Sequence, residues 1–231
     1  MLKERGLIDL ENVAYTYSGG ELLSEMTLSI ASGAFYFLTG PSGSGKTTFL
    51  KMCYGALVPT TGTITIFGQD PRKMTRDDIA LTRRRIGVVH QDCQFLDHLN
   101  VVDNIALPLA AAGQDTLADG ANLKELLNWV GLGHRADALP PELSGGERQR
   151  AALARAVIMS PDIILADEPT GNVDWEMSQR LLQLLVELNR MGKTVVIASH
   201  DLSLIRAAKT EVQARVLRIY NKRVQLAGAN L

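Results

Sequence analysis

The sequence predicts an α/β fold, in which helices cover both faces of a mostly parallel β-sheet. Strand-like runs at Ile163–Asp167 and Thr194–Ser199 are separated by a helical pattern over Trp175–Met191, and a short helix is expected after Asp201. A further apolar run, Phe35–Thr39, precedes a glycine-rich loop and another helical pattern. Alternating strands and helices of this kind are typical of a parallel sheet with helices on its faces.

The rest of the chain divides into a strand-rich first third and a helical middle. Apolar or β-branched runs punctuated by Gly and Pro predict short strands at Leu7–Leu10, Met26–Ile30 and Thr63–Phe67. Between Asn100 and Glu142, leucines at helical spacing predict helices, and one more helix is predicted from about residue 146 to 159.

Composition narrows the function classes. The chain has 231 residues, of which 46% are hydrophobic and 21% charged, which suits a folded core rather than disorder. Its net charge of -1 offers no basic excess, so nucleic acid is not expected as a partner. No apolar stretch reaches the ~18 residues that span a bilayer, no signal peptide is recognised, and the two cysteines show no metal-ligand spacing. We expect a cytoplasmic chain that only another subunit could hold at a membrane.

A glycine-rich loop predicts a nucleotide site. The segment fits the pattern GxxxxGK[ST] between a strand and a helix, where backbone N–H groups and the helix dipole bind phosphate oxygens. Lys46 is expected to reach the β- and γ-phosphates of ATP, and Thr47 to ligate Mg²⁺. A plain turn before a helix is the alternative. The expected ATP contacts are Gly40, Pro41, Ser42, Gly43, Ser44, Gly45, Lys46, Thr47 and Thr48.

Two carboxylates end the apolar run Ile163–Asp167. Asp167 and Glu168 are thereby placed at the carboxyl edge of the sheet, where α/β proteins bind ligands. Asp167 is predicted to hold Mg²⁺, and Glu168 to polarise the attacking water as general base. Such acids are often only helix caps, but the glycine-rich loop earlier in the chain favours the catalytic interpretation.

A second phosphate-binding helix start is predicted at Leu143-Ser144-Gly145-Gly146-Glu147. Ser144 with Glu147 three residues later also fits a capping box, and the two interpretations are compatible because a cap preorganises the donors. Since the first loop already accommodates one triphosphate, this second site is best used by a partner subunit.

These motifs, followed by Ser199-His200-Asp201, resemble in identity and order those of the ABC ATPases over nearly the whole chain. The resemblance implies a single domain, 1–231, with a P-loop NTPase core and an antiparallel β subdomain in about 1–90 and 161–231. It places a helical subdomain carrying the LSGGE signature in about 91–160. It also implies an ATP-dependent homodimer.

The resemblance assigns further residues. Gln91 would touch Mg²⁺ and water and sense a membrane subunit, and His200 would contact the γ-phosphate. Tyr17 would stack on adenine, with Tyr15 as a competitor. Asp174 is the acid of a loop, 171–174, that communicates across the dimer, and Ser144, Gly145, Gly146 and Glu147 bind the nucleotide of the partner. His90 has no assigned role, and Arg83-Arg84-Arg85 is either a solvated face or a contact with lipid or a partner.

Three further segments of the sequence resemble one branch of the family. Arg85–Asp92, Asp103–Leu109 and Ala166–Asn172 are similar to the FtsE type of bacterial cell-division ATPases. This implies an integral membrane partner of the FtsX type, control of peptidoglycan hydrolases, and a place on the inner face of the cell membrane. Lipoprotein-release and macrolide-export ATPases are the alternative. A DNA-repair ATPase is disfavoured because the stretch between the glycine-rich loop and LSGGE shows no sustained heptads of a coiled coil. A scaffold with negligible turnover is disfavoured because the Asp167-Glu168 pair and His200 are intact.

Overall fold

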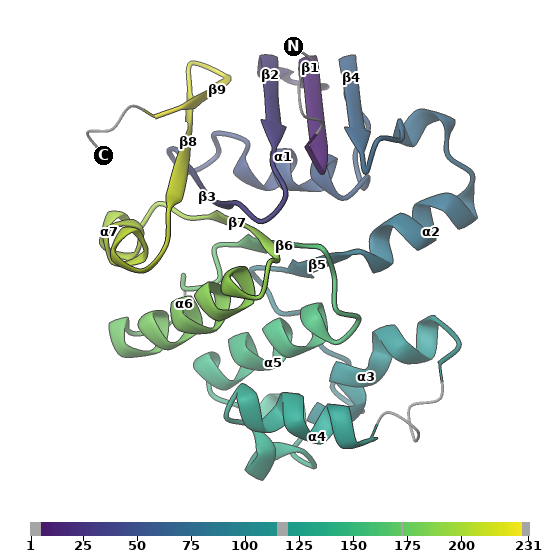
Figure 1. Cartoon of the computed structure of the whole chain (residues 1–231), viewed down its shortest axis with the longest axis vertical. Coiled ribbons are helices and arrows are strands. Elements are labelled where there is room, and N and C mark those ends of the chain that lie inside the picture. The colour runs from purple at the N-terminus through teal and green to yellow at the C-terminus, as the bar shows by residue number, and fades with distance from the viewer. Residues whose placement is uncertain (1–5, 115–119, 172, 228–231) are drawn as a thin grey trace.

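Two sheets and a helical layer make up the structure, a computed structural model that describes residues 6–114, 120–171 and 173–227. Figure 1 shows a three-stranded sheet at one end of the molecule, a larger sheet at its centre, and helices α3, α4 and α5 at the opposite end. The helix α1 (Lys46–Cys53) lies beneath the three-stranded sheet.

The smaller sheet is antiparallel, as predicted. Its order is β2-β1-β4, formed by Gly20–Ile30, Ile8–Tyr17 and Thr61–Ile66. Ile8 pairs with Ile30 on one side and Ile66 on the other. β1 and β2 are longer than the predicted strands, because polar residues of the hairpin extend the ladder into solvent.

The central sheet has the order β5-β6-β7-β3-β8-β9 and is parallel except for β9. Three predicted strands lie at its centre and are buried over their whole length: β3 (Phe35–Thr39), β6 (Ile163–Asp167) and β7 (Thr194–Ala198). Burial on both faces explains why they read as continuous apolar runs. Among the described residues, five elements were not predicted: β5 (Ile86–Val89), β8 (Ala214–Tyr220), β9 (Arg223–Leu226), α2 (Arg76–Arg84) and the short turn η1 (Pro71–Lys73).

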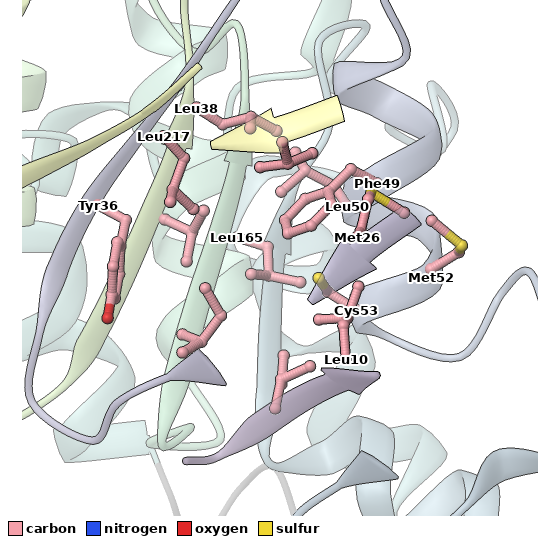
Figure 2. Packing of buried hydrophobic residues seen from close by; sticks show 14 of the residues in the cluster. Leu10, Met26, Tyr36, Leu38, Phe49, Leu50, Met52, Cys53, Leu165 and Leu217 are labelled. Carbon is pink, nitrogen blue, oxygen red and sulfur yellow. The ribbon is translucent and has the colours of Figure 1, made fainter. Parts of the chain in front are cut away.

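Alternate residues of each central strand enter different cores. Leu38 and Leu165 contact the cluster that α1 and the antiparallel sheet complete, in which Phe49, Leu50 and Met52 are almost fully buried (Figure 2). Phe37 faces the opposite cluster, which is closed by α6 (Trp175–Arg190) and α7 (Leu202–Glu211). Because alternate side chains of a strand face opposite sides of the sheet, one set packs against α1 and holds this helix against the sheet.

The helical layer has its own small core. It comprises α3 (Val101–Ala111), α4 (Gly120–Trp129) and α5 (Gly145–Val157), together with the short turns η2 (Gly133–Arg135) and η3 (Pro140–Glu142). α5 joins this layer to the central sheet, because Ala151 and Ala154 enter the helical core whereas Ala152 and Leu153 enter the sheet core. No helix in the described ranges is long and apolar enough to cross a membrane.

Two of the three residues in the basic run have local structural partners. Arg83 donates to the carbonyl oxygens of Tyr54 and Gly55, at 3.3 and 2.9 Å, and so caps the end of α1. Arg85 forms an ion pair with Asp162 at 2.7 Å, and its guanidinium lies 3.8 Å from the centre of the Phe67 ring. These contacts give Arg83 and Arg85 structural partners, whereas Arg84 is exposed and its contact with lipid or a partner stays a prediction.

Candidate functional site

A cavity of about 610 Å³ opens where β3 and β6 end and α1 begins. It brings together segments that are more than 150 residues apart in the chain, as expected for the carboxyl edge of a parallel sheet. The lining residues are Leu22, Pro41, Ser42, Gly43, Gly45, Lys46, Thr47, Thr48, Gln91, Asp167, Glu168, Gly171 and His200.

The loop between β3 and α1 has the backbone that a phosphate cradle needs. Gly43 and Gly45 have φ values of 73° and 102°, which side chains other than glycine rarely tolerate. Gly45 begins α1 without a side-chain cap, which leaves the first N–H groups available to an anion. Ser44 Oγ is buried without a hydrogen-bond partner among the described residues. The loop therefore offers several donors for phosphate oxygens.

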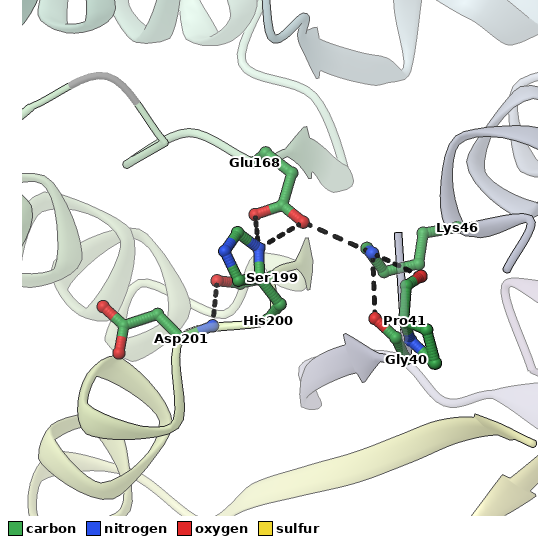
Figure 3. Close-up of polar contacts among 7 residues, drawn as sticks. All are labelled: Gly40, Pro41, Lys46, Glu168, Ser199, His200 and Asp201. Carbon is green, nitrogen blue, oxygen red and sulfur yellow. Dashed lines mark hydrogen bonds and ion pairs between the residues drawn. The ribbon is translucent and has the colours of Figure 1, made fainter. Parts of the chain in front are cut away.

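Lys46 lies at the floor of this loop and is only 8% exposed. Its ammonium donates to the carbonyl oxygens of Gly40 at 3.0 Å and Pro41 at 3.3 Å, and it lies 3.4 Å from Glu168 Oε1 (Figure 3). These contacts fix a positive charge directly beside the cradle, where the predicted phosphate contact requires it.

Glu168 follows β6 and joins the site from the other side. Its carboxylate oxygens lie 3.0 and 3.1 Å from His200 Nδ1, so the carboxylate is shared between His200 and Lys46 (Figure 3). The backbone of Glu168 has a φ of 44°, a strained value for a residue with a long side chain. Its N–H donates to the Ala198 carbonyl at 2.9 Å, which helps to hold this geometry.

Asp167 and Thr47 offer oxygen ligands for a hard cation. Asp167 is 7% exposed, and its Oδ1 has no hydrogen-bond partner in the part of the chain that the structure describes. Burial raises the pKa of Asp167, and a hydrogen bond from the Thr47 side chain opposes this. An orphaned buried oxygen beside a hydroxyl fits Mg²⁺, which uses few protein ligands and keeps waters. Gln91 lines the same cavity.

Tyr17 lies near the mouth of the cradle with its ring available. It is 46% exposed, and its hydroxyl is 3.4 Å from Thr48 Oγ1. Tyr15 contacts Tyr17 edge-on at 4.9 Å and packs against the core. Neither tyrosine is among the residues that line the cavity, and the adenine contact of Tyr17 stays a prediction. Sequence reasoning missed Leu22, an apolar lining residue that no motif marks.

The signature residues do not line the cavity. Ser144 caps α5, accepting a hydrogen bond from Glu147 N at 3.3 Å, while Glu147 Oε2 accepts one from Ser144 N at 2.9 Å. Ser144 and Gly145 are exposed, and Gly146 is buried against Met177. The predicted capping box is therefore formed, and its exposed end stands apart from the cavity of its own chain.

The capping box leads to a prediction about acid stability. Hydrogen bonds from the Ser144 backbone and from Arg135 lower the pKa of Glu147 from 4.5 to about 2. Because the folded-state pKa lies below the unfolded one, the resulting stabilisation is present above about pH 4.5 and is lost as the pH falls toward 2. Glu147→Gln should therefore be less stable than the wild type at about pH 6, and the difference should shrink by about pH 3. Urea unfolding at both pH values measures it, and a constant difference would contradict the assignment.

Asp174 and His90 are not among the residues that line the cavity. Asp174 caps α6 by accepting a hydrogen bond from Met177 N at 2.8 Å, and it is absent from the lining. Of the remaining loop residues, Gly171 lines the cavity, and Asn172 lies outside the described residues. His90 is half-buried, with its ring 6.2 Å from that of Tyr54, and burial lowers its pKa.

Comparison with known proteins agrees with this geometry. The model of the family described as ABC transporter matches residues 23–171. The chain is 38% identical over 209 residues to the cell division ATP-binding protein FtsE of Bacillus subtilis, covering 90% of this chain and 92% of that protein. It is 41% identical over 200 residues to FtsE of Escherichia coli K12, covering 86% and 90%.

Solved structures are similar as well. The fold matches a dimeric ATP-binding cassette in a post-hydrolysis state, bound to ADP and phosphate, with a TM-score of 0.85 and 33% identity. The match covers 94% of this chain and 96% of that one. A second dimeric structure, of a bacterial ABC transporter cassette, matches with a TM-score of 0.84.

Proposed function

The chain belongs to the ABC transporter family, and we propose that it hydrolyses ATP in a head-to-tail homodimer that serves bacterial cell division. One observation carries the proposal: Lys46, Glu168 and His200, from three separate elements, meet in one cavity, whereas the signature is exposed elsewhere. Each chain thus holds a site for one triphosphate, together with the signature residues that complete the site of a second chain.

ATP binds through its phosphates in the glycine-rich loop. The backbone N–H groups of Gly43, Gly45, Lys46, Thr47 and Thr48 and the Ser44 hydroxyl donate to phosphate oxygens, and Lys46 supplies the positive charge. Tyr17 stacks on the adenine, and Leu22 adds an apolar contact at the cavity wall.

The residues present fit Mg²⁺. Thr47 and Gln91 would hold it directly, and Asp167 through water. The chemistry that the cation supplies when bound is neutralisation of phosphate charge. Lys46 adds a second positive charge from the protein itself, and the buried carboxylate of Asp167 is kept in place by Thr47.

Glu168 acts as the general base. Phosphate oxygens compete for the Lys46 ammonium and for His200, and this frees the Glu168 carboxylate to orient a water molecule. The water oxygen forms a bond to the γ-phosphorus while the bond to the β–γ bridging oxygen breaks. The proton of the water passes to Glu168, and ADP and phosphate leave.

A second copy of the chain completes the site. In a head-to-tail pair, Ser144, Gly145 and Gly146 of one subunit donate to the γ-phosphate held by the other, with Glu147 fixing the helix start. Asp174 lies at the adjoining helix start, from which it communicates across the interface. The two similar solved cassettes are dimers, which supports this arrangement.

The membrane partner is an integral subunit of the FtsX type, which places this chain peripherally on the inner face of the bacterial cell membrane. Relatives of 38–41% identity over most of the chain bear the FtsE name and support the cell-division assignment. Affinity capture from native membranes, followed by mass spectrometry, tests the partner. Recovery of a lipoprotein-release or macrolide-export permease would overturn the cell-division role and leave the ATPase role intact.

Loss of the Lys46 charge tests the phosphate cradle itself. Lys46→Ala should weaken ATP binding about tenfold or more, because a buried charge-assisted contact is removed. Titration with a fluorescent ATP analogue measures the affinity. Lys51→Ala, on the same helix but outside the cavity, is the matched control and should bind normally. Equal affinity in Lys46→Ala and the control would place the phosphates elsewhere.

A further inference from the structure

The segment 91–95 carries Gln91 from the central sheet toward the helical layer. The side chains of Gln91, Asp92 and Gln94 are exposed, and only Cys93 is buried. Cys93 has a φ of 52°, a left-handed conformation that a non-glycine residue keeps only when its surroundings enforce it. Contacts to the backbone therefore determine where Gln91 lies.

One guanidinium, that of Arg155 on α5, donates two hydrogen bonds to the backbone of this segment. Arg155 Nη1 donates to the Gln94 carbonyl at 2.8 Å, and Nη2 donates to the Cys93 carbonyl at 3.0 Å. The same guanidinium lies 4.6 Å from the centre of the Phe95 ring. Three consecutive residues of the segment are thus held by one side chain.

Arginine suits this position in a way that lysine does not. Its planar fork can bridge two carbonyl oxygens while its face stacks on an aromatic ring, whereas an ammonium is a point donor. Burial lowers the pKa of Arg155. Within residues 6–114, 120–171 and 173–227 no carboxylate forms an ion pair with it. The half-buried charge is therefore matched by the two backbone carbonyls.

Other residues of α5 support the same segment. Gln149 is 3% exposed, and its Nε2 lies 3.5 Å from the Gln91 carbonyl oxygen. Arg148 places its guanidinium 5.4 Å from the Phe95 ring centre. Because α5 is anchored in both the sheet core and the helical core, it provides a rigid base for these contacts.

From these contacts we infer that Arg155 is a positioning residue for the reaction, holding the backbone of segment 91–95 so that Gln91 meets the nucleotide of its own chain. The inference rests on the proposed ATPase function. Arg155 does not line the cavity, so it acts through Gln91 and not on ATP. Its loss should slow turnover without weakening nucleotide binding.

The first test separates turnover from binding. Arg155→Met should lower kcat about tenfold, while affinity for a fluorescent ATP analogue changes less than about threefold. Arg190→Met is the matched control: Arg190 also donates to a backbone carbonyl and pairs with Glu211, at the far end of α6. It should keep wild-type kcat. Where thermal unfolding shows Arg155→Met to be misfolded, Arg155→Lys replaces it and should also lower kcat.

The second test asks which site the defect affects. In a mixed dimer with Lys46→Ala, the Arg155→Met chain supplies the only intact P-loop. The working site then contains the Gln91 segment of the Arg155→Met chain, which is the defective one. In a mixed dimer with Ser144→Arg, the Arg155→Met chain supplies only the signature of the working site. The P-loop and the Gln91 segment of that site both come from the Ser144→Arg chain, whose Gln91 segment is intact. Hydrolysis should be low in the first mixture and higher, by several-fold, in the second. Equal rates in the two mixtures would overturn the inference.

Failure of the inference and failure of the proposed function are distinguishable. If Glu168→Gln hydrolyses ATP as fast as the wild type, the catalytic site has been assigned wrongly. If Glu168→Gln is inactive and Arg155→Met has wild-type kcat, only the positioning role of Arg155 is overturned.

Discussion

Glu168→Gln is expected to lower ATP hydrolysis at least ~10²-fold while ATP binding persists, because glutamine keeps the shape of the side chain and removes the base. The structure sharpens this expectation: the Glu168 carboxylate is close to both Lys46 and His200, in the cavity that holds the predicted phosphate contacts. An amide still fits there but accepts no proton from water. Turnover is measured as phosphate release under saturating ATP.

A matched control for Glu168→Gln is available on α6. Glu176 is an exposed glutamate that pairs with Arg180, and it does not line the cavity. Glu176→Gln should hydrolyse ATP at the wild-type rate. Because Glu168→Gln retains the triphosphate, its ATP-bound dimer should accumulate and be visible by sedimentation. Near wild-type turnover in Glu168→Gln would assign the base to another residue.

Ser144→Arg should abolish ATP-dependent dimerisation and hydrolysis and leave ATP binding by the monomer largely intact. Ser144 is exposed at the start of α5 and does not line the cavity of its own chain, so a bulky cation there cannot block the cradle directly. It would instead obstruct the surface that faces the partner's γ-phosphate.

Loss of the cap needs its own control. Ser144 accepts a hydrogen bond from Glu147 N, and removing such a cap costs about 1 kcal/mol of stability. Ser144→Ala loses the cap without adding bulk or charge, and it should retain more dimerisation and hydrolysis than Ser144→Arg. If the two variants were equally inactive, loss of the Ser144 hydroxyl, as helix cap or as phosphate donor, rather than blocked docking would explain the defect.

Local motifs made much of the site predictable. Three parts of the site are each a short continuous stretch of sequence that was assigned from its own residues: the strand Phe35–Thr39, the glycine-rich loop and the Asp167-Glu168 pair. Their meeting in one cavity also follows, because parallel strands present their carboxyl ends at one edge of a sheet. The contact of His200 with Glu168 was not predicted, since it depends on the pairing of β6 with β7.

Two of the missed elements, α2 and β9, have weak apolar patterns. No residue of α2 is buried, so its sequence shows no apolar stripe, although Thr75 and Asp78 form a capping box that marks its start. β9 buries only Val224 and exists because it pairs with β8. The side chains of Leu22 and Leu23 both lie beside Gly45, and Leu22 lines the cavity, a proximity that no sequence pattern records.

Mixing two variants that should each be inactive, Lys46→Ala and Ser144→Arg, shows whether the site is shared between two chains. In the mixed dimer one site pairs an intact P-loop with an intact signature, and the other site is doubly defective. Each variant alone should be inactive, and mixing the two should restore part of the wild-type hydrolysis. Absence of any recovery, with both variants folded and Ser144→Arg still binding ATP, would contradict a site built from two chains.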